Sequence, residues 1–320
     1  MARVVVLGSI NTDMTVQLPR LPAPGETLLG GSYVSGPGGK GANQAVAARR
    51  AGAVVHFLSA VGDDPLGQQA LDRYRGENID VSDVLVVPDI PSGVALIFVN
   101  DAGENMIGVA PGANAHLAPA AIDRLADSVF KPGEVLLAGL EVPLETVARA
   151  VHRAHRAGMY VILNPAPADI RLLDSEILRE VDLLTPNHLE VQALAGRPNR
   201  DDPDGIRQAA EALFARGVGA VVVTIGKEGC LVFSRDAAGV TCRAIEAFLV
   251  DAIDTVGAGD AFNGALATAI AEGRPLFESA VWASAAAALA VTQPGAQTAL
   301  AQRATIDRLA ATLGRSGNAE

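Results

Sequence analysis

The chain has 320 residues, of which 49% are hydrophobic, and a formal net charge of -11. This length and apolar content are enough for one large α/β domain or for one domain that carries an insertion. Because the charges are scattered and acidic in balance, nucleic acid and anionic membranes are not expected as partners. No run of about 18 uninterrupted apolar residues occurs, so we expect no membrane-spanning helix.

The chain begins with an apolar, β-branched run, Val4–Ile10, followed by Asn11 and Asp13. One basic residue precedes the run and no small-residue cleavage site follows it. We therefore interpret it as the first core strand rather than a secretory signal, and expect a cytoplasmic protein. The two cysteines, Cys230 and Cys242, fit no zinc or redox spacing, which predicts reduced thiols in neighbouring strands.

Buried strands and amphipathic helices alternate along most of the chain. The further predicted strands are Val54–Ala60, Val135–Leu140, Tyr160–Leu163, Leu183–Thr185 and Ala220–Ile225. The predicted helices are Ala42–Ala51, Leu144–Ala157, Ala258–Ala271, Leu276–Val291 and Ile306–Leu313. This alternation predicts a mainly parallel sheet with helices on both faces.

Two stretches, residues 14–34 and 82–109, interrupt that rhythm. They contain short runs separated by Gly, Pro and Asp, namely Thr27–Leu29, Val84–Val87, Ala95–Val99 and Asn105–Val109. We predict that they form a small antiparallel sheet, a lid built from two insertions in a single domain of residues 1–314. The polar residues 315–320 are predicted to form a disordered tail.

The strongest chemical signal is the segment from Asp254 to Leu266, Asp-Thr-Val-Gly-Ala-Gly-Asp-Ala-Phe-Asn-Gly-Ala-Leu. Gly257, Ala258 and Gly259 precede a helix, and a helix N-terminus with converging backbone N–H groups suits a phosphoryl group. Asp260 in the first turn can accept a proton from an attacking hydroxyl. The motif alone is equally compatible with an ordinary aspartate stabilised by the helix dipole.

A second glycine-rich segment, Gly36-Pro-Gly-Gly-Lys-Gly-Ala-Asn43, opens another predicted helix. It is not a P-loop, because Lys40 is followed by Gly41 rather than Ser or Thr. Lys40 and Asn43 offer donors beside glycines that allow close backbone approach, although a tight strand-to-helix turn explains the motif as well.

Polar residues also follow several predicted strands. Asn11 and Asp13 come after the first strand, where ligands bind in open α/β sheets, and Asp13 can accept two sugar hydroxyls. A capped turn is the alternative for this pair. Glu141 ends another strand. The segment Gly8–Asn11 does not match G-x-G-x-x-G, which argues against a dehydrogenase.

Two segments suit a nucleotide. Thr224–Gly229 follows a strand and is equally explained by a glycine hairpin. Asn187 begins a helix with Glu190 three residues later. The pair is either a capping arrangement or a contact to phosphate and magnesium through water.

Together these motifs resemble the ribokinase family of sugar and nucleoside kinases, from Val4 to about Gln297. The two signatures are Gly-Gly-Lys-Gly-Ala-Asn-Gln at 38–44 and Asp-Thr-Val-Gly-Ala-Gly-Asp-Ala-Phe-Asn-Gly at 254–264. Further similarity lies in Gly8–Asp13, Ser92–Asn100, Asn164–Pro167 and Thr185–Asn187. The resemblance implies a three-layer α/β/α sandwich with a β lid over the sugar, and a homodimer formed through the lids.

The resemblance also implies roles for individual residues. The implied sugar contacts are Asn11, Asp13, Gly39, Lys40, Gly41, Ala42, Asn43, Glu141 and Asp260. The implied ATP contacts are Asn187, Thr224, Ile225, Gly226, Lys227, Glu228, Gly229, Gly259 and Ser284. Asp260 matches the family's catalytic base, and Gly257, Ala258 and Gly259 match its anion hole. Magnesium is implied with ATP near Glu190, and an activating potassium ion near Asp254, Val256, Ala290, Gln293 and Gly295.

The chain departs from the family pattern beside that cation site. It lacks a basic residue at Gln293 or Pro294 and a hydroxyl at Ala299, which weakens the expected potassium site. The resemblance implies ATP-dependent phosphorylation of D-ribose at its 5-hydroxyl to give ribose 5-phosphate. The alternatives are a kinase of the same family for another small sugar or a nucleoside, and a non-catalytic sugar- or nucleotide-binding protein. The retained Asp260 and glycines disfavour the latter.

Overall fold

The computed structural model describes residues 2–196, 203–236 and 239–316. Its central sheet has eight strands in the order β14-β13-β12-β11-β10-β9-β1-β4. The parallel strands are β1 (Arg3–Leu7), β4 (Val54–Leu58), β9 (Val135–Gly139), β10 (Tyr160–Asn164), β11 (Leu183–Leu184) and β12 (Ala220–Thr224). An antiparallel hairpin, β13 (Cys230–Asp236) and β14 (Gly239–Ile245), completes one edge.

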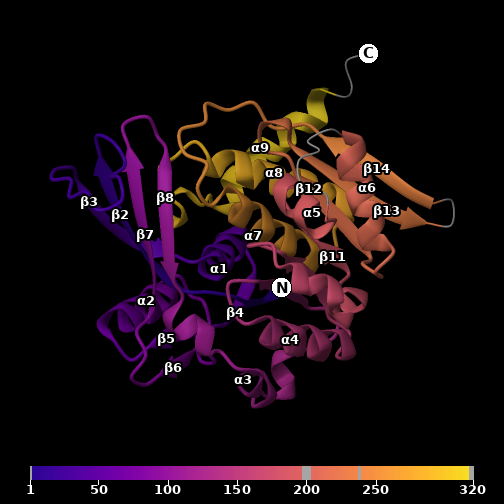
Figure 1. Cartoon of the computed structure of the whole chain (residues 1–320). Helices are drawn as coiled ribbons and strands as arrows, with labels where there is room; N and C mark the ends of the chain where they lie inside the picture. The colour runs from indigo at the N-terminus through magenta and orange to yellow at the C-terminus, as the bar shows by residue number, and fades with distance from the viewer. Residues whose placement is uncertain (1, 197–202, 237–238, 317–320) are drawn as a thin grey trace.

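Helices cover both faces of this sheet, as the alternating pattern predicted (Figure 1). One face packs on α1 (Lys40–Ala51), α7 (Ala258–Ala271), α8 (Leu276–Ala290) and α9 (Arg303–Ser316). The other packs on α3 (Pro119–Asp123), α4 (Leu144–Arg156), α5 (His188–Leu194) and α6 (Pro203–Phe214). Alternate residues of β1 enter the two cores: Val4 and Val6 join the first, Val5 and Leu7 the second. The predicted three-layer α/β/α fold is confirmed.

A separate four-stranded sheet stands beside this body, at the left of Figure 1. Its order is β3 (Tyr33–Gly38), β2 (Asn11–Leu18), β7 (Gly93–Asn100) and β8 (Asn105–Ala110). The prediction of an all-antiparallel lid is wrong, because β2 pairs with β7 in parallel. The two central strands come from separate insertions and leave the body side by side, whereas each outer strand returns along its neighbour.

Two of the short runs predicted for the lid lie elsewhere. Val84–Val87 contributes β6 (Leu85–Val87), which pairs with β5 (Ala60–Gly62) in a two-stranded sheet. Thr27–Leu29 forms no strand, and Leu29 is 88% exposed. A short apolar run becomes a strand only where it pairs with a partner edge, and residues 27–29 pair with none among the described residues. Between β5 and β6 lies α2 (Pro65–Gly76).

The remaining predictions concern the cysteines and the termini. Cys230 and Cys242 are free thiols in the adjacent strands β13 and β14, as expected. Helix α9 continues to Ser316, beyond the predicted start of the tail, and residues 317–320 lie outside the described part of the chain. Within the described ranges, no helix has both the length and the apolar content that a membrane span requires.

Candidate active site

Asp260 lies in the first turn of α7 and is 8% exposed. Gly257 begins the helix with φ 77°, a left-handed conformation that suits glycine. The Asp260 carboxylate accepts hydrogen bonds from Asn43 Nδ2 at 2.8 Å and from Gln44 Nε2 at 3.1 Å, both on α1. Burial raises the pKa of Asp260 to about 6, while Lys40 and the two amides oppose that rise. At neutral pH it is therefore an ionised carboxylate poised to take a proton.

Helices α1 and α7 approach closely because they meet through small residues. A Cβ on Gly264 would lie 2.5 Å from the Ala47 side chain and 2.6 Å from a backbone oxygen of α1. Glycine at this position therefore lets the Asn43 and Gln44 side chains reach Asp260. The N-terminus of α1 is equally tight, since a Cβ on Gly41 would come within 2.4 Å of the Gly8 carbonyl carbon.

The Asp260 carboxylate belongs to a charged cluster, defined as Asp13, Lys40, Glu141 and Asp260. Lys40 Nζ lies 3.3 Å from Glu141 Oε1, and the Lys40 backbone N–H donates to Glu141 Oε2 at 3.0 Å. Ser9 Oγ donates to the same oxygen at 2.5 Å. Burial alone would lower the pKa of Lys40, but nearby carboxylates, Glu141 first, raise it above its ordinary value. The lysine is therefore a permanent cation among acids.

Asp13 projects from lid strand β2 into the same cluster. Burial and the charge of Glu141 raise its pKa to about 6, and Lys40 opposes the rise. Gly38 on the neighbouring strand β3 leaves room for this carboxylate, because a Cβ there would lie 2.0 Å from Asp13 Oδ1. Asn11 begins the same strand and is buried, and its Oδ1 accepts a hydrogen bond from Asn114 Nδ2 at 2.9 Å. That bond leaves the Asn11 amide nitrogen as the end available to a ligand.

The other predicted sugar contacts differ in what they can offer. Gly39 precedes α1 with φ 89°. Ala42 is wholly buried in the core, and its N–H donates to Ser9 O at 2.9 Å, so its side chain faces away from any ligand. Gly41 packs against Gly8. These residues shape the start of α1, while Asn11, Asp13, Lys40, Asn43 and Glu141 carry the polar groups.

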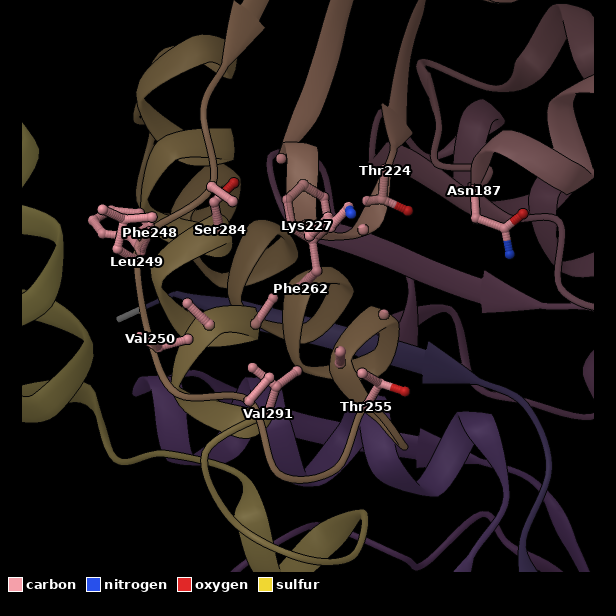
Figure 2. A pocket seen from close by; sticks show the side chains of 18 of the residues that line it. Asn187, Thr224, Lys227, Phe248, Leu249, Val250, Thr255, Phe262, Ser284 and Val291 are labelled. Atoms are coloured by element: carbon pink, nitrogen blue, oxygen red, sulfur yellow. The ribbon is translucent and has the colours of Figure 1, made fainter. Parts of the chain in front are cut away.

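A cavity of about 490 Å³ opens next to Asp260 (Figure 2). Predicted nucleotide contacts that line it are Asn187, Thr224, Gly226, Lys227, Gly229, Gly259 and Ser284. Ile225 and Glu228 do not line it. The opposite wall was not predicted: it comes from the loop Ala247–Val250 and from Phe262, Ala287 and Val291. The cavity thus combines backbone-rich turns on one side with apolar side chains on the other.

Several polar groups around the cavity are already engaged within the protein. Asn187 and Glu190 form a reciprocal capping box at 2.8 Å in each direction, so the capping interpretation of this pair is confirmed. The cap uses Asn187 Oδ1, which leaves its Nδ2 as a donor. Burial raises the pKa of Glu190. Ser284 Oγ donates to Ala280 O at 2.9 Å, so its hydroxyl serves helix α8.

The predicted cation residues meet where two loops touch. Asp254 accepts hydrogen bonds from Val256 N at 3.0 Å and from Gly295 N at 2.8 Å. The carboxylate therefore ties the turn before α7 to the loop after α8. Ala290 ends α8, and Gln293 is exposed in that loop. Each carboxylate oxygen keeps a second lone pair, so this donor set fits a monovalent cation as well as a purely structural tie.

Known proteins resemble this chain over nearly its full length. The model of the pfkB family carbohydrate kinases matches residues 1–303. The chain belongs to that family. A ribokinase from Haemophilus influenzae is 40% identical over 298 residues, covering 93% of this chain and 95% of the relative. A deoxyribokinase from Salmonella typhi is 38% identical over 295 residues, covering 92% and 94%.

Solved structures agree with this membership. The structure of Arabidopsis thaliana ribokinase complexed with ribose and ATP has a TM-score of 0.83 and 28% sequence identity, covering 97% of this chain and 99% of that one. Ribokinase from Thermotoga maritima gives a TM-score of 0.84 at 31% identity, covering 97% and 99%. The resemblance to the ribokinase family and the predicted ATP-dependent sugar kinase are thereby confirmed.

Proposed function

We propose that this kinase transfers the γ-phosphoryl group of ATP to the 5-hydroxyl of D-ribose, with Asp260 as the general base. The observation that carries this proposal is Asp260 itself, a buried carboxylate in the charged cluster that directly follows Gly259 in the cavity wall. The hydroxyl proton passes to Asp260 as the sugar oxygen forms its bond to phosphorus. The bond from phosphorus to the departing ADP oxygen breaks, so charge and atoms balance.

The remaining groups bind the sugar and ATP and neutralise the charge of the phosphates. Asn11, Asp13 and Glu141 suit sugar hydroxyls, and the cavity suits ATP, with its apolar wall against the base. The backbone N–H groups from Gly257 to Gly259, at the start of α7, suit the negative charge on the transferring group. Magnesium bound with ATP would neutralise phosphate charge. Glu190, half-buried beside Lys40, fits its water shell.

A panel of acceptors tests the substrate directly. ADP release would be followed with D-ribose, 2-deoxy-D-ribose, a hexose and a nucleoside at saturating MgATP. We expect the highest kcat/KM with D-ribose. The 38% identical deoxyribokinase makes 2-deoxy-D-ribose the second candidate. Preference for a hexose or nucleoside would overturn the substrate assignment, and sugar binding without turnover would overturn the kinase assignment for this chain.

We propose that a potassium ion activates the enzyme by binding to Asp254 and nearby carbonyl groups, because hard cations prefer oxygen ligands. Turnover would be assayed at constant ionic strength and fixed magnesium with potassium exchanged for a bulky organic cation, in the parent and in Asp254→Ala. We expect activation of the parent alone. No effect of potassium on the parent would refute a cation role, and equal activation of both proteins would place the ion elsewhere.

A homodimer formed through the lids, in the cytoplasm, completes the proposal. The support is a set of large apolar lid side chains that are 51–61% exposed: Tyr33, Val34, Leu96, Met106, Ile107 and Val109. Exposed apolar area of this kind commonly marks an interface. Sedimentation should give a dimer for the parent and a monomer for Ile107→Lys. A monomeric parent at micromolar concentration would contradict it.

A further inference from the structure

A chain of buried amides connects Asp260 to the backbone of Thr185. Gln44 Nε2 donates both to Asp260 Oδ1 at 3.1 Å and to Asn164 Oδ1 at 3.0 Å. Asn164, at the end of β10, donates through Nδ2 to the Thr185 carbonyl at 2.9 Å. Gln44 is 0%, Asn164 6% and Thr185 2% exposed. The chain therefore runs from the backbone next to β11 to the carboxylate through buried side chains.

The Thr185 carbonyl fixes the orientation of every amide in this chain. A backbone carbonyl can only accept, so Asn164 must present its NH2 group to it and its oxygen to Gln44. An oxygen facing Gln44 in turn requires the NH2 end of Gln44 at that position. The same NH2 end then faces Asp260. Gln44 cannot turn its oxygen toward Asp260 without opposing the Asn164 oxygen.

This orientation leaves one buried oxygen of Gln44 without a hydrogen bond in the described part of the chain, which packing alone does not explain. Gln44 Oε1 is buried and has no hydrogen-bond partner among the described residues. An unsatisfied buried acceptor destabilises a fold, and one at a functional site calls for a functional explanation. Donation to Asp260 supplies one, because the amide stabilises the charged carboxylate over its protonated form.

We infer that Asn164 and Gln44 act as a positioning pair, in which Asn164 locks Gln44 as an obligate donor that keeps Asp260 ionised and aimed. This inference rests on the proposed role of Asp260 as base. Thr185 also holds the start of α7, which carries the proposed anion hole. Its Oγ1 donates to Asn263 Oδ1 at 2.6 Å, and Asn263 Nδ2 donates to Gly259 O at 2.8 Å.

Other charges act on Asp260 and must be kept constant in any test. Lys40 on α1 lowers its pKa, whereas Glu141 after β9 raises it. Glu190 on α5 also interacts electrostatically with Asp260. Gln44 and Asn164 are neutral amides whose hydrogen bonds described above involve none of these three side chains, so both can be replaced without removing a charge. Buried Asn43 holds the other carboxylate oxygen and stays in place.

The test measures the ionisation of Asp260 without substrate. Aspartate side chains would be labelled with carbon-13 at the carboxyl group and titrated by NMR, with the Asp260 signal identified by its loss in Asp260→Asn. Gln44→Met keeps length and helix propensity but removes the donor. We expect it to raise the Asp260 midpoint by about one pH unit, the range of one charge-assisted hydrogen bond.

Asn164→Leu tests whether the chain acts as a unit. Although Asn164 does not touch Asp260, its loss frees Gln44 to turn, so the midpoint should rise in the same direction. The double variant should shift no further than Gln44→Met alone. If Asn164→Leu does not fold, Asn164→Ala replaces it. Thr268→Val is the control, since buried Thr268 bonds Ala48 O and Gly264 O at the same helix interface without contact to Asp260.

The outcomes separate this inference from the proposed function. An unmoved midpoint in Gln44→Met, or in Asn164→Leu alone, overturns the positioning pair, as does an equal shift in Thr268→Val. At pH 8 we also expect kcat of Gln44→Met to fall about tenfold with the sugar KM changed less than twofold. If instead Asp260→Asn keeps its turnover, the base assignment fails while the NMR result still decides whether the pair controls Asp260.

Discussion

The charged cluster, which includes Asp260, and the cavity, which is lined by the neighbouring Gly259, are built by different means. The cluster concentrates three carboxylates and one lysine, two of the acids having a pKa near 6. The cavity is formed by glycine turns and apolar walls, and Ser284 among its hydroxyls is satisfied internally. Single side chains should therefore dominate the sugar side, where charge acts at short range, and matter little on the nucleotide side, where shape and backbone act.

The largest effect should come from Asp260→Asn. The variant keeps the shape of the side chain and removes the base, so turnover should fall by on the order of 100-fold or more. ADP release measures the loss, and circular dichroism together with unchanged ATP binding would show that the fold is intact. Near-normal turnover in a folded variant would remove Asp260 from the mechanism.

Next in size is Asp13→Ala, which should weaken sugar binding by about 2–5 kcal/mol, the range for a buried charged hydrogen-bond partner. ATP binding should change little, because Asp13 does not line the cavity. Calorimetry with each ligand checks both statements. An equal loss for the two ligands would mean that Asp13 supports the structure rather than the sugar.

The pH dependence of kcat/KM tests the difference between the charged cluster and the cavity. Asp13 and Asp260 both act as carboxylates, and burial raises each pKa to about 6, so kcat/KM should fall as pH drops through that value. Lys40 lowers both pKa values. Lys40→Met should therefore move the acid limb above pH 6. The matched variant Lys227→Met, in the cavity wall, should leave the limb in place, and a similar shift there would refute local control by Lys40.

The smallest effect should come from Ser284→Ala. Because the hydroxyl is committed to Ala280 O and lies near Cys230 Sγ, its loss should change the ATP KM less than about threefold. Steady-state kinetics at saturating sugar measures this, with Gly229→Ala as the comparison, since a Cβ there would lie 2.0 Å from Ile245 O. A tenfold or greater rise in KM for Ser284→Ala would mean that the hydroxyl turns to the nucleotide.

The sequence predicted what depends on local pattern. The strand Val135–Leu140 and the helix Leu144–Ala157 follow from periodicity, and these two observed elements each end one residue earlier. The first strand and the last helix differ from their predicted bounds by up to three residues at an end. The parallel pairing of β2 with β7 was missed, because alternation specifies the faces of a strand and not its partner. Thr27–Leu29 was predicted as a strand from composition, but it pairs with no strand in the part of the chain that the structure describes.

The site shows the same division. Asp260 was found because the glycines before it mark a helix start. Gln44 and Asn164 stood within quoted motifs, yet their roles depend on a contact between α1, α7 and β10 that no spacing encodes. Asn114 was hidden for a similar reason, since it reaches Asn11 across a separation of 103 residues. Phe248 and Val291 are apolar, and only the fold shows that they face the cavity.

The parallel pairing of β2 with β7 gives the lid a single point of attachment to the body, about which it can tilt. Both strands leave the body at one place, the pair Asn11–Gly93, which we call the root of the lid. The four strands can therefore tilt together about that root. β2 has eight residues, and at about 3.3 Å per residue its tip lies roughly 26 Å away. A tilt of about 10° at the root would then move the tip by roughly 4–5 Å. Asn11 and Asp13, the proposed sugar contacts, lie at or near this root, so a small movement there would be enlarged at the tip of the lid.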